Sequence, residues 1–285
     1  MNTKSLITTV VSFVILHSPF LRAASTINST NNYAYGANIG WLNFVGDTNN
    51  GAVVGEYICS GYIYSANVGW INLGSGVPAN QIQYQNNSAT DFGVNQDGLG
   101  NLTGYAYGAN IGWITFEQTY GHPKVNLLTG QLSGSVWSAN CGWISLSNAV
   151  AYVQTDRIQK GALAPDGLPI AWLLQNFSTT NVNANADPDL DSQSNLQEYL
   201  AGTDPNNAAS ALKITSIFRT TPNTTLNWNA VNTRYYAIQT NSLLSTGAWG
   251  DYATQNLAGW NSSLFADSMP TNRFYRIRAY RPLTP

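Results

Sequence analysis

A run of acidic and amide side chains between positions 187 and 198 is the segment best equipped for chemistry. If Asp187 is counted as position 1 of a twelve-residue loop, oxygen-bearing residues stand at positions 1, 3, 5, 7, 9 and 12. They are Asp187, Asp189, Asp191, Gln193, Asn195 and Glu198. Carboxylate and carbonyl oxygens at this spacing are the ligands that Ca²⁺ prefers. The sequence therefore predicts a Ca²⁺ site here, in which Gln193 offers its backbone carbonyl.

This loop resembles the EF-hand-like calcium segments of the dockerin and thrombospondin type 3 kind, found in exported bacterial multidomain surface proteins. Residues 166–207, followed by a β-rich end, are similar to a common C-terminal arrangement in such proteins. Two positions depart from the pattern, since Ser192 replaces the usual glycine and Ser194 the usual apolar residue. The resemblance implies low-affinity, structural calcium binding and implies no activity. The alternative interpretation is a solvated acidic linker.

One phrase occurs four times in the first half of the chain, at residues 33–44, 62–73, 105–116 and 135–146. Each copy has two alternating segments around an Ala-Asn-X-Gly turn, which predicts a β-hairpin with a four-residue connection. The Gly-Trp pair in each copy resembles the GW-type β-repeats of surface proteins. Repeated units bury their cores against one another, so we expect one repeat domain that closes as a sandwich, a barrel or a small propeller.

Alternation also separates the two faces of each hairpin. The aliphatic residues that follow each tryptophan, such as Leu42 and Phe44, belong to one face and are expected to form the core. The tryptophans point to the opposite face, where each can pair with an aromatic residue of the partner strand. They are Trp41, Trp70, Trp113 and Trp143. We expect these aromatic pairs to pack between units; the alternative is that the four tryptophans contact a glycan.

The chain divides into four parts, and the fold class that they predict is mainly β. Residues 1–25, with a basic start, an apolar run and small residues, have the features of a secretory signal peptide. Residues 26–155 form the β-repeat domain. Residues 156–207 form a linker with short helices at 170–177 and 195–201 around the calcium loop. Residues 208–285 contain several short apolar or alternating runs, which predict a C-terminal β-sandwich.

Composition limits the partners and the location. Charged residues are 9% of the chain and the formal net charge is -2, which argues against nucleic-acid binding. No segment after the signal peptide is apolar enough to cross a bilayer, so we expect an exported, extracellular or cell-surface protein that is not integral to the membrane. Export would expose Cys59 and Cys141 to oxidising conditions, and the sequence leaves open whether they form a disulfide or stay as two buried thiols.

Catalytic arrangements are scarce in this sequence. His122 is the one histidine outside the signal peptide, which leaves no His-based triad. A carboxylate pair such as Glu56 with Glu117 could serve a glycosidase in principle, but nothing in the spacing supports it. We therefore expect a non-catalytic structural or adhesion protein with a calcium-stabilised connector. The alternative is a carbohydrate-binding module that uses the repeat aromatics, and a weaker alternative is a glycoside hydrolase. The expected partners are polysaccharide, extracellular matrix or cell-envelope components.

Overall fold

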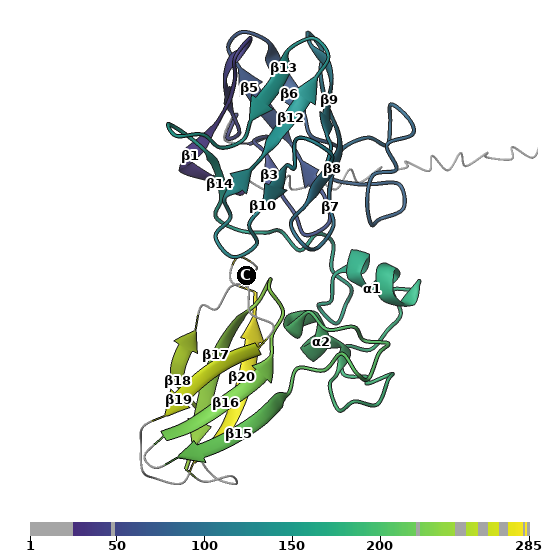
Figure 1. Cartoon of the computed structure of the whole chain (residues 1–285). Coiled ribbons are helices and arrows are strands. Elements are labelled where there is room, and N and C mark those ends of the chain that lie inside the picture. The colour runs from purple at the N-terminus through teal and green to yellow at the C-terminus, as the bar shows by residue number, and fades with distance from the viewer. Residues whose placement is uncertain are drawn as a thin grey trace, which may run out of the picture.

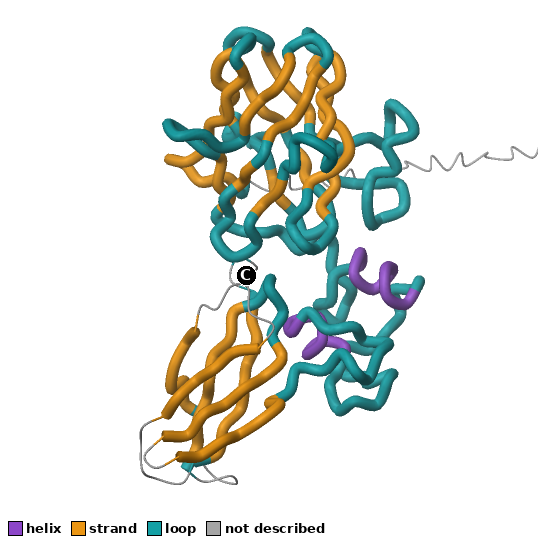
Figure 2. The backbone as a smooth tube through the Cα atoms, viewed as in Figure 1, coloured by secondary structure: helices purple, strands orange, loops and turns teal. Residues whose placement is uncertain are grey.

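The computed structural model describes residues 25–46, 49–220, 223–242, 249–255, 262–267, 273–281 and 283. The predicted signal peptide, apart from Ser25, lies outside these residues. Strands form a barrel in the first half and a sandwich in the last part, and the helices lie in the segment between them (Figure 1, Figure 2). This confirms the mainly β fold class. Of the three closures left open by the sequence, the repeat domain adopts the barrel.

In the described residues the barrel wall consists of four antiparallel hairpins, one from each repeat. The wall closes on itself because the last hairpin strand pairs with the first, through Tyr35 opposite Ser145 and Gly36 opposite Ile144. The hairpins are β1 Ile27–Gly36 with β2 Gly40–Asn43, β5 Tyr62–Ser65 with β6 Gly69–Asn72, β8 Leu102–Gly108 with β9 Gly112–Phe116, and β12 Ser135–Ser138 with β13 Gly142–Ser145.

Short strands extend the barrel wall beyond the hairpins. β7 pairs with β8, and β14 pairs with β1. Two further antiparallel pairs, β3 with β4 and β10 with β11, lie outside this sheet. Their bounds are β3 Val53–Val54, β4 Cys59–Ser60, β7 Val94–Gln96, β10 Lys124–Val125, β11 Leu132–Ser133 and β14 Val153–Thr155.

The hairpin connections are one residue shorter than the sequence predicted. Gly36 pairs with Gly40, which leaves three residues in the turn, and the other hairpins have the same register. The second glycine is itself the first residue of the returning strand, with φ between 71° and 79° in the four copies. A residue with a Cβ is strained in this left-handed region, which explains why every copy has glycine here.

Aliphatic side chains fill the interior of the barrel, as the alternation predicted. Leu42, Ile63, Ile71, Ile114 and Ile144 are at most 3% exposed. An eight-stranded barrel is narrow enough for side chains to fill it completely. The turn residue between each asparagine and glycine is also buried and closes one end of the barrel; these residues are Ile39, Val68, Ile111 and Cys141.

The turn asparagines join neighbouring hairpins to one another. Each side-chain Nδ2 donates a 3.0 Å hydrogen bond to a backbone carbonyl in the turn of the adjacent hairpin. The pairs are Asn38 to Cys141, Asn67 to Ile39, Asn110 to Val68 and Asn140 to Ile111. These four bonds form a closed ring around the end of the barrel, because the first hairpin donates to the last.

The connector contains two helices, α1 Ile170–Phe177 and α2 Asn195–Ala201, which confirms both predicted helices at their predicted bounds. Gly202 ends α2 in the left-handed conformation. Neither helix, nor any other in the described part of the chain, is long and apolar enough to cross a bilayer.

The C-terminal domain packs two three-stranded antiparallel sheets face to face (Figure 1). Leu226, Trp228, Tyr236 and Ile238 are fully buried in its core. The sheets are β15-β16-β19 and β18-β17-β20. Their strands are β15 Ile214–Thr220, β16 Asn223–Asn229, β17 Tyr235–Asn241, β18 Gly250–Gln255, β19 Ser262–Asp267 and β20 Phe274–Tyr280.

A buried polar cluster joins the barrel, the connector and the sandwich. The Tyr199 hydroxyl of α2 donates to Glu56 Oε2 at 2.9 Å, and the Arg281 guanidinium pairs with the other oxygen of the same carboxylate. Arg281 also lies 4.9 Å from the centre of the Tyr199 ring. Arg234 of the sandwich donates to the carbonyl of Leu200 at 2.8 Å. Helix α2 therefore contacts both β domains.

Candidate functional site

The three aspartates of the connector loop converge. Carboxylate oxygens of Asp187, Asp189 and Asp191 lie within 4.8 Å of one another. Leu190 and Ser192 take positive φ values of 63° and 76°, which turn the backbone sharply at loop positions 4 and 6. The Asp187 carboxylate accepts hydrogen bonds from the backbone N–H of Asp191 at 3.2 Å and of Ser192 at 2.9 Å. The turn is therefore stabilised by one of the predicted ligands.

Buried oxygens without hydrogen-bond partners concentrate in this loop. In the described residues, six buried side-chain polar atoms lack a partner, and four of them belong to predicted ligands. These four are Asp189 Oδ2, Asp191 Oδ2, Asn195 Oδ1 and Glu198 Oε2. An unsatisfied buried polar group costs about 1–3 kcal/mol, and more when it is charged. A bound cation would satisfy those of the oxygens that reach it; among the described residues, the carboxylates that lie within 4.8 Å of one another are those of the three aspartates, and Glu198 is not part of this group.

The electrostatics of the loop also favour a bound cation. Burial, followed by the charges of Asp189 and Asp191, raises the pKa of Glu198 to about 7. Burial and the adjacent carboxylates also raise the pKa of Asp189. The carboxylates therefore repel one another, and a divalent cation among them would relieve the repulsion. The donors are all oxygen, which suits Ca²⁺ and not a metal that prefers nitrogen or sulfur.

The structure gives a role to Gln193 and to the two serines that depart from the EF-hand pattern, Ser192 and Ser194. Gln193 uses its side chain to bond the backbone of Leu212, at 3.3 and 3.4 Å, so its backbone carbonyl is the group left for a cation. Ser194 caps α2 and forms a capping box with Gln197. Ser192 adopts the left-handed conformation for which the motif normally uses glycine.

The four repeat tryptophans face solvent. Trp41, Trp70, Trp113 and Trp143 are 44–46% exposed. Each pairs with an aromatic residue of its own hairpin, as predicted, with ring centres 4.8–5.2 Å apart. The expectation that these pairs pack between units holds only in part, because Trp70 and Trp143 lie against Gly46 and Gly121 in the loops after neighbouring repeats, whereas 44–46% of each tryptophan stays exposed. A closed barrel buries only the inner face of its wall, and the hydrogen bonds of the turn asparagines connect adjacent hairpins at the turns.

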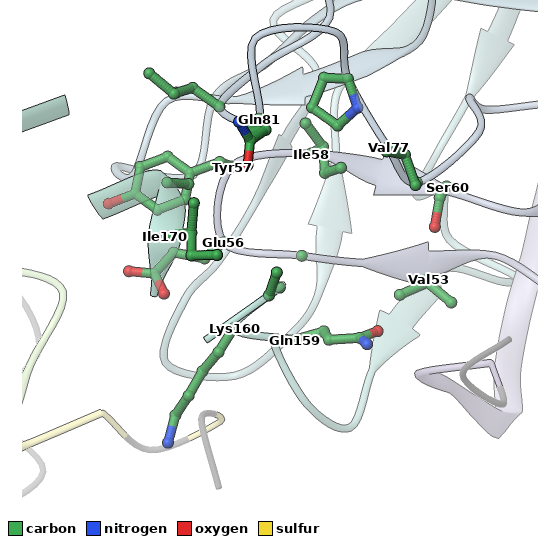
Figure 3. A pocket seen from close by; sticks show the side chains of 17 residues that line it. Val53, Glu56, Tyr57, Ile58, Ser60, Val77, Gln81, Gln159, Lys160 and Ile170 are labelled. Atoms are coloured by element: carbon green, nitrogen blue, oxygen red, sulfur yellow. The ribbon is translucent and has the colours of Figure 1, made fainter. Parts of the chain in front are cut away.

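A pocket of about 240 Å³ lies between the base of the barrel, the loop after β6 and helix α1 (Figure 3). Ile58, Val77 and Ile170 form part of its apolar lining. Figure 3 shows the Glu56 carboxylate and the Lys160 amine pointing away from Ile58 and Val77. The Glu56 carboxylate is instead bound to Tyr199 and Arg281 in the polar cluster.

Other candidate residues from the sequence have structural roles. Glu117, the second carboxylate of the suggested glycosidase pair, accepts hydrogen bonds from the backbone N–H groups of Thr119 and Gly121 at 2.6 and 2.7 Å. Both glutamates are therefore engaged within the fold. Cys59 and Cys141 are free, buried thiols, so the structure contains no disulfide between them.

The fold and the site define a mainly β protein in which a connector with an acidic loop joins a closed barrel, with aromatic residues on its outer face, to a sandwich. No protein-family model, curated protein or solved structure matches the chain. Function must therefore be inferred from the chain's own geometry.

Proposed function

We propose that the protein is an exported, non-catalytic adhesion protein whose barrel binds polysaccharide. The observation that carries this proposal is the exposure of all four repeat tryptophans on the outside of the barrel. Exposed indole and phenol rings offer apolar faces for stacking against sugar rings, and polar tips for hydroxyl groups. The aliphatic side chains already fill the core, so the aromatic residues are not needed there. The low charge of the chain suits an uncharged partner.

We also propose that the connector loop holds Ca²⁺ as a structural ion. The converging aspartates and the four unsatisfied buried oxygens support this proposal. Glu198, the last ligand, belongs to α2 and immediately precedes Tyr199, which bonds Glu56 of the barrel. Ion binding would thus stabilise the helix that contacts both β domains.

Affinity electrophoresis through gels containing single soluble polysaccharides tests carbohydrate binding. The folded protein should be retarded by at least one polysaccharide, and its tryptophan fluorescence should shift in the same mixture. A folded protein that migrates normally in every gel and shows no fluorescence change would contradict the proposal.

Thermal unfolding with excess Ca²⁺ or with EDTA tests the ion. Ca²⁺ at roughly ten times its Kd should stabilise the folded state by about 1.4 kcal/mol. An unfolding midpoint that is the same in both conditions would rule out this site.

A further inference from the structure

We propose that polysaccharide binding is concentrated on one side of the barrel, in two neighbouring grooves beside Trp113 and Trp143, and that the occupant is a neutral glycan. This inference rests on the proposed carbohydrate-binding function and identifies its site. The four hairpins are nearly alike, but the loops beside them differ. In the described residues, Trp113 and Trp143 each form one wall of a groove together with such a loop.

The first groove, the Trp113 groove, has a volume of about 480 Å³. Its lining is Asn86, Asn87, Ser88, Phe92, Tyr105 and Trp113. The Phe92 ring meets Trp113 nearly edge to face, with centres 5.0 Å apart and planes at 86°. The Asn87 side chain is exposed and makes no hydrogen bond within the described residues, so its amide is available to a sugar hydroxyl. The groove thus combines an aromatic platform with a polar rim.

The wall of the Trp113 groove comes from residues 74–104, the segment between the second and third repeats. Buried Tyr84 holds this segment, since its hydroxyl donates to the Cys59 carbonyl at 3.1 Å and accepts from Gly76 N–H at 2.7 Å. The Asn86 amide is fixed in turn by Gly93 N–H and the Tyr84 carbonyl, at 3.0 and 3.3 Å. A wall held in this way is formed before the ligand arrives, which lowers the entropy cost of binding.

The second groove, the Trp143 groove, has a volume of about 350 Å³ and is lined by Glu117, Thr119, Tyr120, Trp137 and Trp143. Trp137 and Trp143 pair across the fourth hairpin with ring centres 5.2 Å apart. Gly121 permits Trp143 to lie against the adjacent loop, because a Cβ at this glycine would stand 3.1 Å from the indole. Tyr120 is 80% exposed at the rim.

The lining of both grooves favours an uncharged ligand. Glu117 is the one charged residue among the lining residues of the two grooves, and its carboxylate is directed to the backbone N–H groups of its own loop. Neither lining contains lysine or arginine. Aromatic faces, amides and hydroxyls are the groups that contact neutral sugars, whereas an anionic chain would find no cation to pair with.

The two grooves lie on adjacent hairpins, because β9 pairs with β12 and places Thr115 opposite Trp137. Trp113 and Trp143 stand on strands that are two positions apart in the wall. Strands are spaced about 5 Å apart, so the two strands are separated by about 10 Å along the wall. One glycan chain of several sugar units can therefore occupy both grooves. Once the chain is held in one groove, its contact with the other is intramolecular, and this raises the overall affinity.

Single Trp→Ala variants test this inference, with Trp41→Ala as the matched control. Trp41 occupies the equivalent hairpin position, is equally exposed, and contacts Tyr33 and Tyr35 of its own hairpin. In gels containing the polysaccharide that retards the wild type most, W113A and W143A should each weaken binding roughly tenfold, and W41A less than about twofold. Unfolding midpoints identify any variant that is misfolded. N87A and Y120A repeat the test with exposed rim residues and should each weaken binding severalfold.

The outcomes separate the inference from the function on which it rests. If W41A weakens binding as much as W113A does, the aromatic residues act as a uniform ring; the proposed function survives and the two-groove inference does not. Retention by anionic polysaccharides alone would also overturn the inference, because the grooves lack cations. If wild-type protein binds no polysaccharide, the proposed function itself fails.

Discussion

Ser192 and Ser194 show how single residues can depart from a metal-loop motif and preserve its geometry. Ser192 adopts a φ of 76°, the conformation that glycine normally supplies at this loop position. Ser194 accepts a hydrogen bond from Gln197 N–H, and the Gln197 side chain accepts one from Ser194 N–H at 2.8 Å. The first serine turns the loop and the second starts the helix that contributes Glu198.

At the scale of single residues, we predict that Glu198→Gln removes most of the Ca²⁺-dependent stabilisation. The substitution takes away the negative charge of the final ligand and leaves the side-chain volume nearly unchanged. The difference between unfolding in Ca²⁺ and in EDTA, about 1.4 kcal/mol for the wild type at tenfold excess over Kd, should fall close to zero. Differential scanning calorimetry measures it.

Asp204→Asn is the matched control for Glu198→Gln. Asp204 lies outside the loop and accepts a hydrogen bond from Asn206 N–H at 3.0 Å, which asparagine can also accept. This variant should respond to Ca²⁺ as the wild type does. If Ca²⁺ stabilises the Glu198→Gln variant as much as it stabilises the Asp204→Asn variant, Glu198 is not a ligand.

At the scale of the elements, the hairpins are nearly identical and the bonds between their turns are made by asparagine. Each turn carries one amide donor and one accepting carbonyl, so the four turns can bond in a ring. The sequence places one asparagine in each turn but does not show which carbonyl its amide bonds. Local spacing could not reveal the true partner, because the accepting carbonyl belongs to a different repeat.

We predict that Asn110→Ala destabilises the barrel by about 1 kcal/mol. The substitution removes the bond to the Val68 carbonyl and interrupts the ring between the second and third hairpins. Urea unfolding followed by circular dichroism measures the loss. Asn87→Ala, at an exposed position whose side chain makes no hydrogen bond with the residues that the structure describes, should change stability by less than about 0.5 kcal/mol. Equal effects of the two substitutions would show that the ring does not stabilise the barrel.

At the scale of the whole molecule, the polar cluster around Glu56 connects three parts of the chain. Glu56 comes from the barrel, Tyr199 from the connector and Arg281 from the end of the sandwich, and all three side chains are buried. Removing one partner from a buried ion pair leaves the other charge uncompensated. The junction should therefore be sensitive to single substitutions.

We predict that Arg281→Ala destabilises the protein by about 3 kcal/mol or more and uncouples the unfolding of the barrel from that of the sandwich. Calorimetry should show two separate unfolding transitions for this variant, whereas the transitions of the barrel and the sandwich should lie closer together in the wild type. Arg278→Ala, at an exposed position of β20, the strand that ends just before Arg281, should leave the unfolding profile almost unchanged. If R281A unfolds as R278A does, the cluster does not couple the domains.

Much of the local structure followed from the sequence alone. The Asn-Gly turns and alternating residues predicted the four hairpins and their core face, and the turn and capping residues predicted both helices at their observed bounds. The spacing of six oxygen-bearing residues predicted a cation loop, and the structure brings the three aspartates of that loop together. These features are local, because they depend on backbone preferences and on residues that are near in sequence.

The sequence by itself thus determined the hairpin repeat, the two helices and the acidic loop. The tertiary structure alone decided that the repeats close into a barrel, that the tryptophans face outward, and that the segment between the second and third repeats forms one wall of a groove. The alternating pattern separates two faces of a sheet, but which face becomes the outside depends on how the sheet curls and closes. That closure is made by pairing between β1 and β13, which are far apart along the chain.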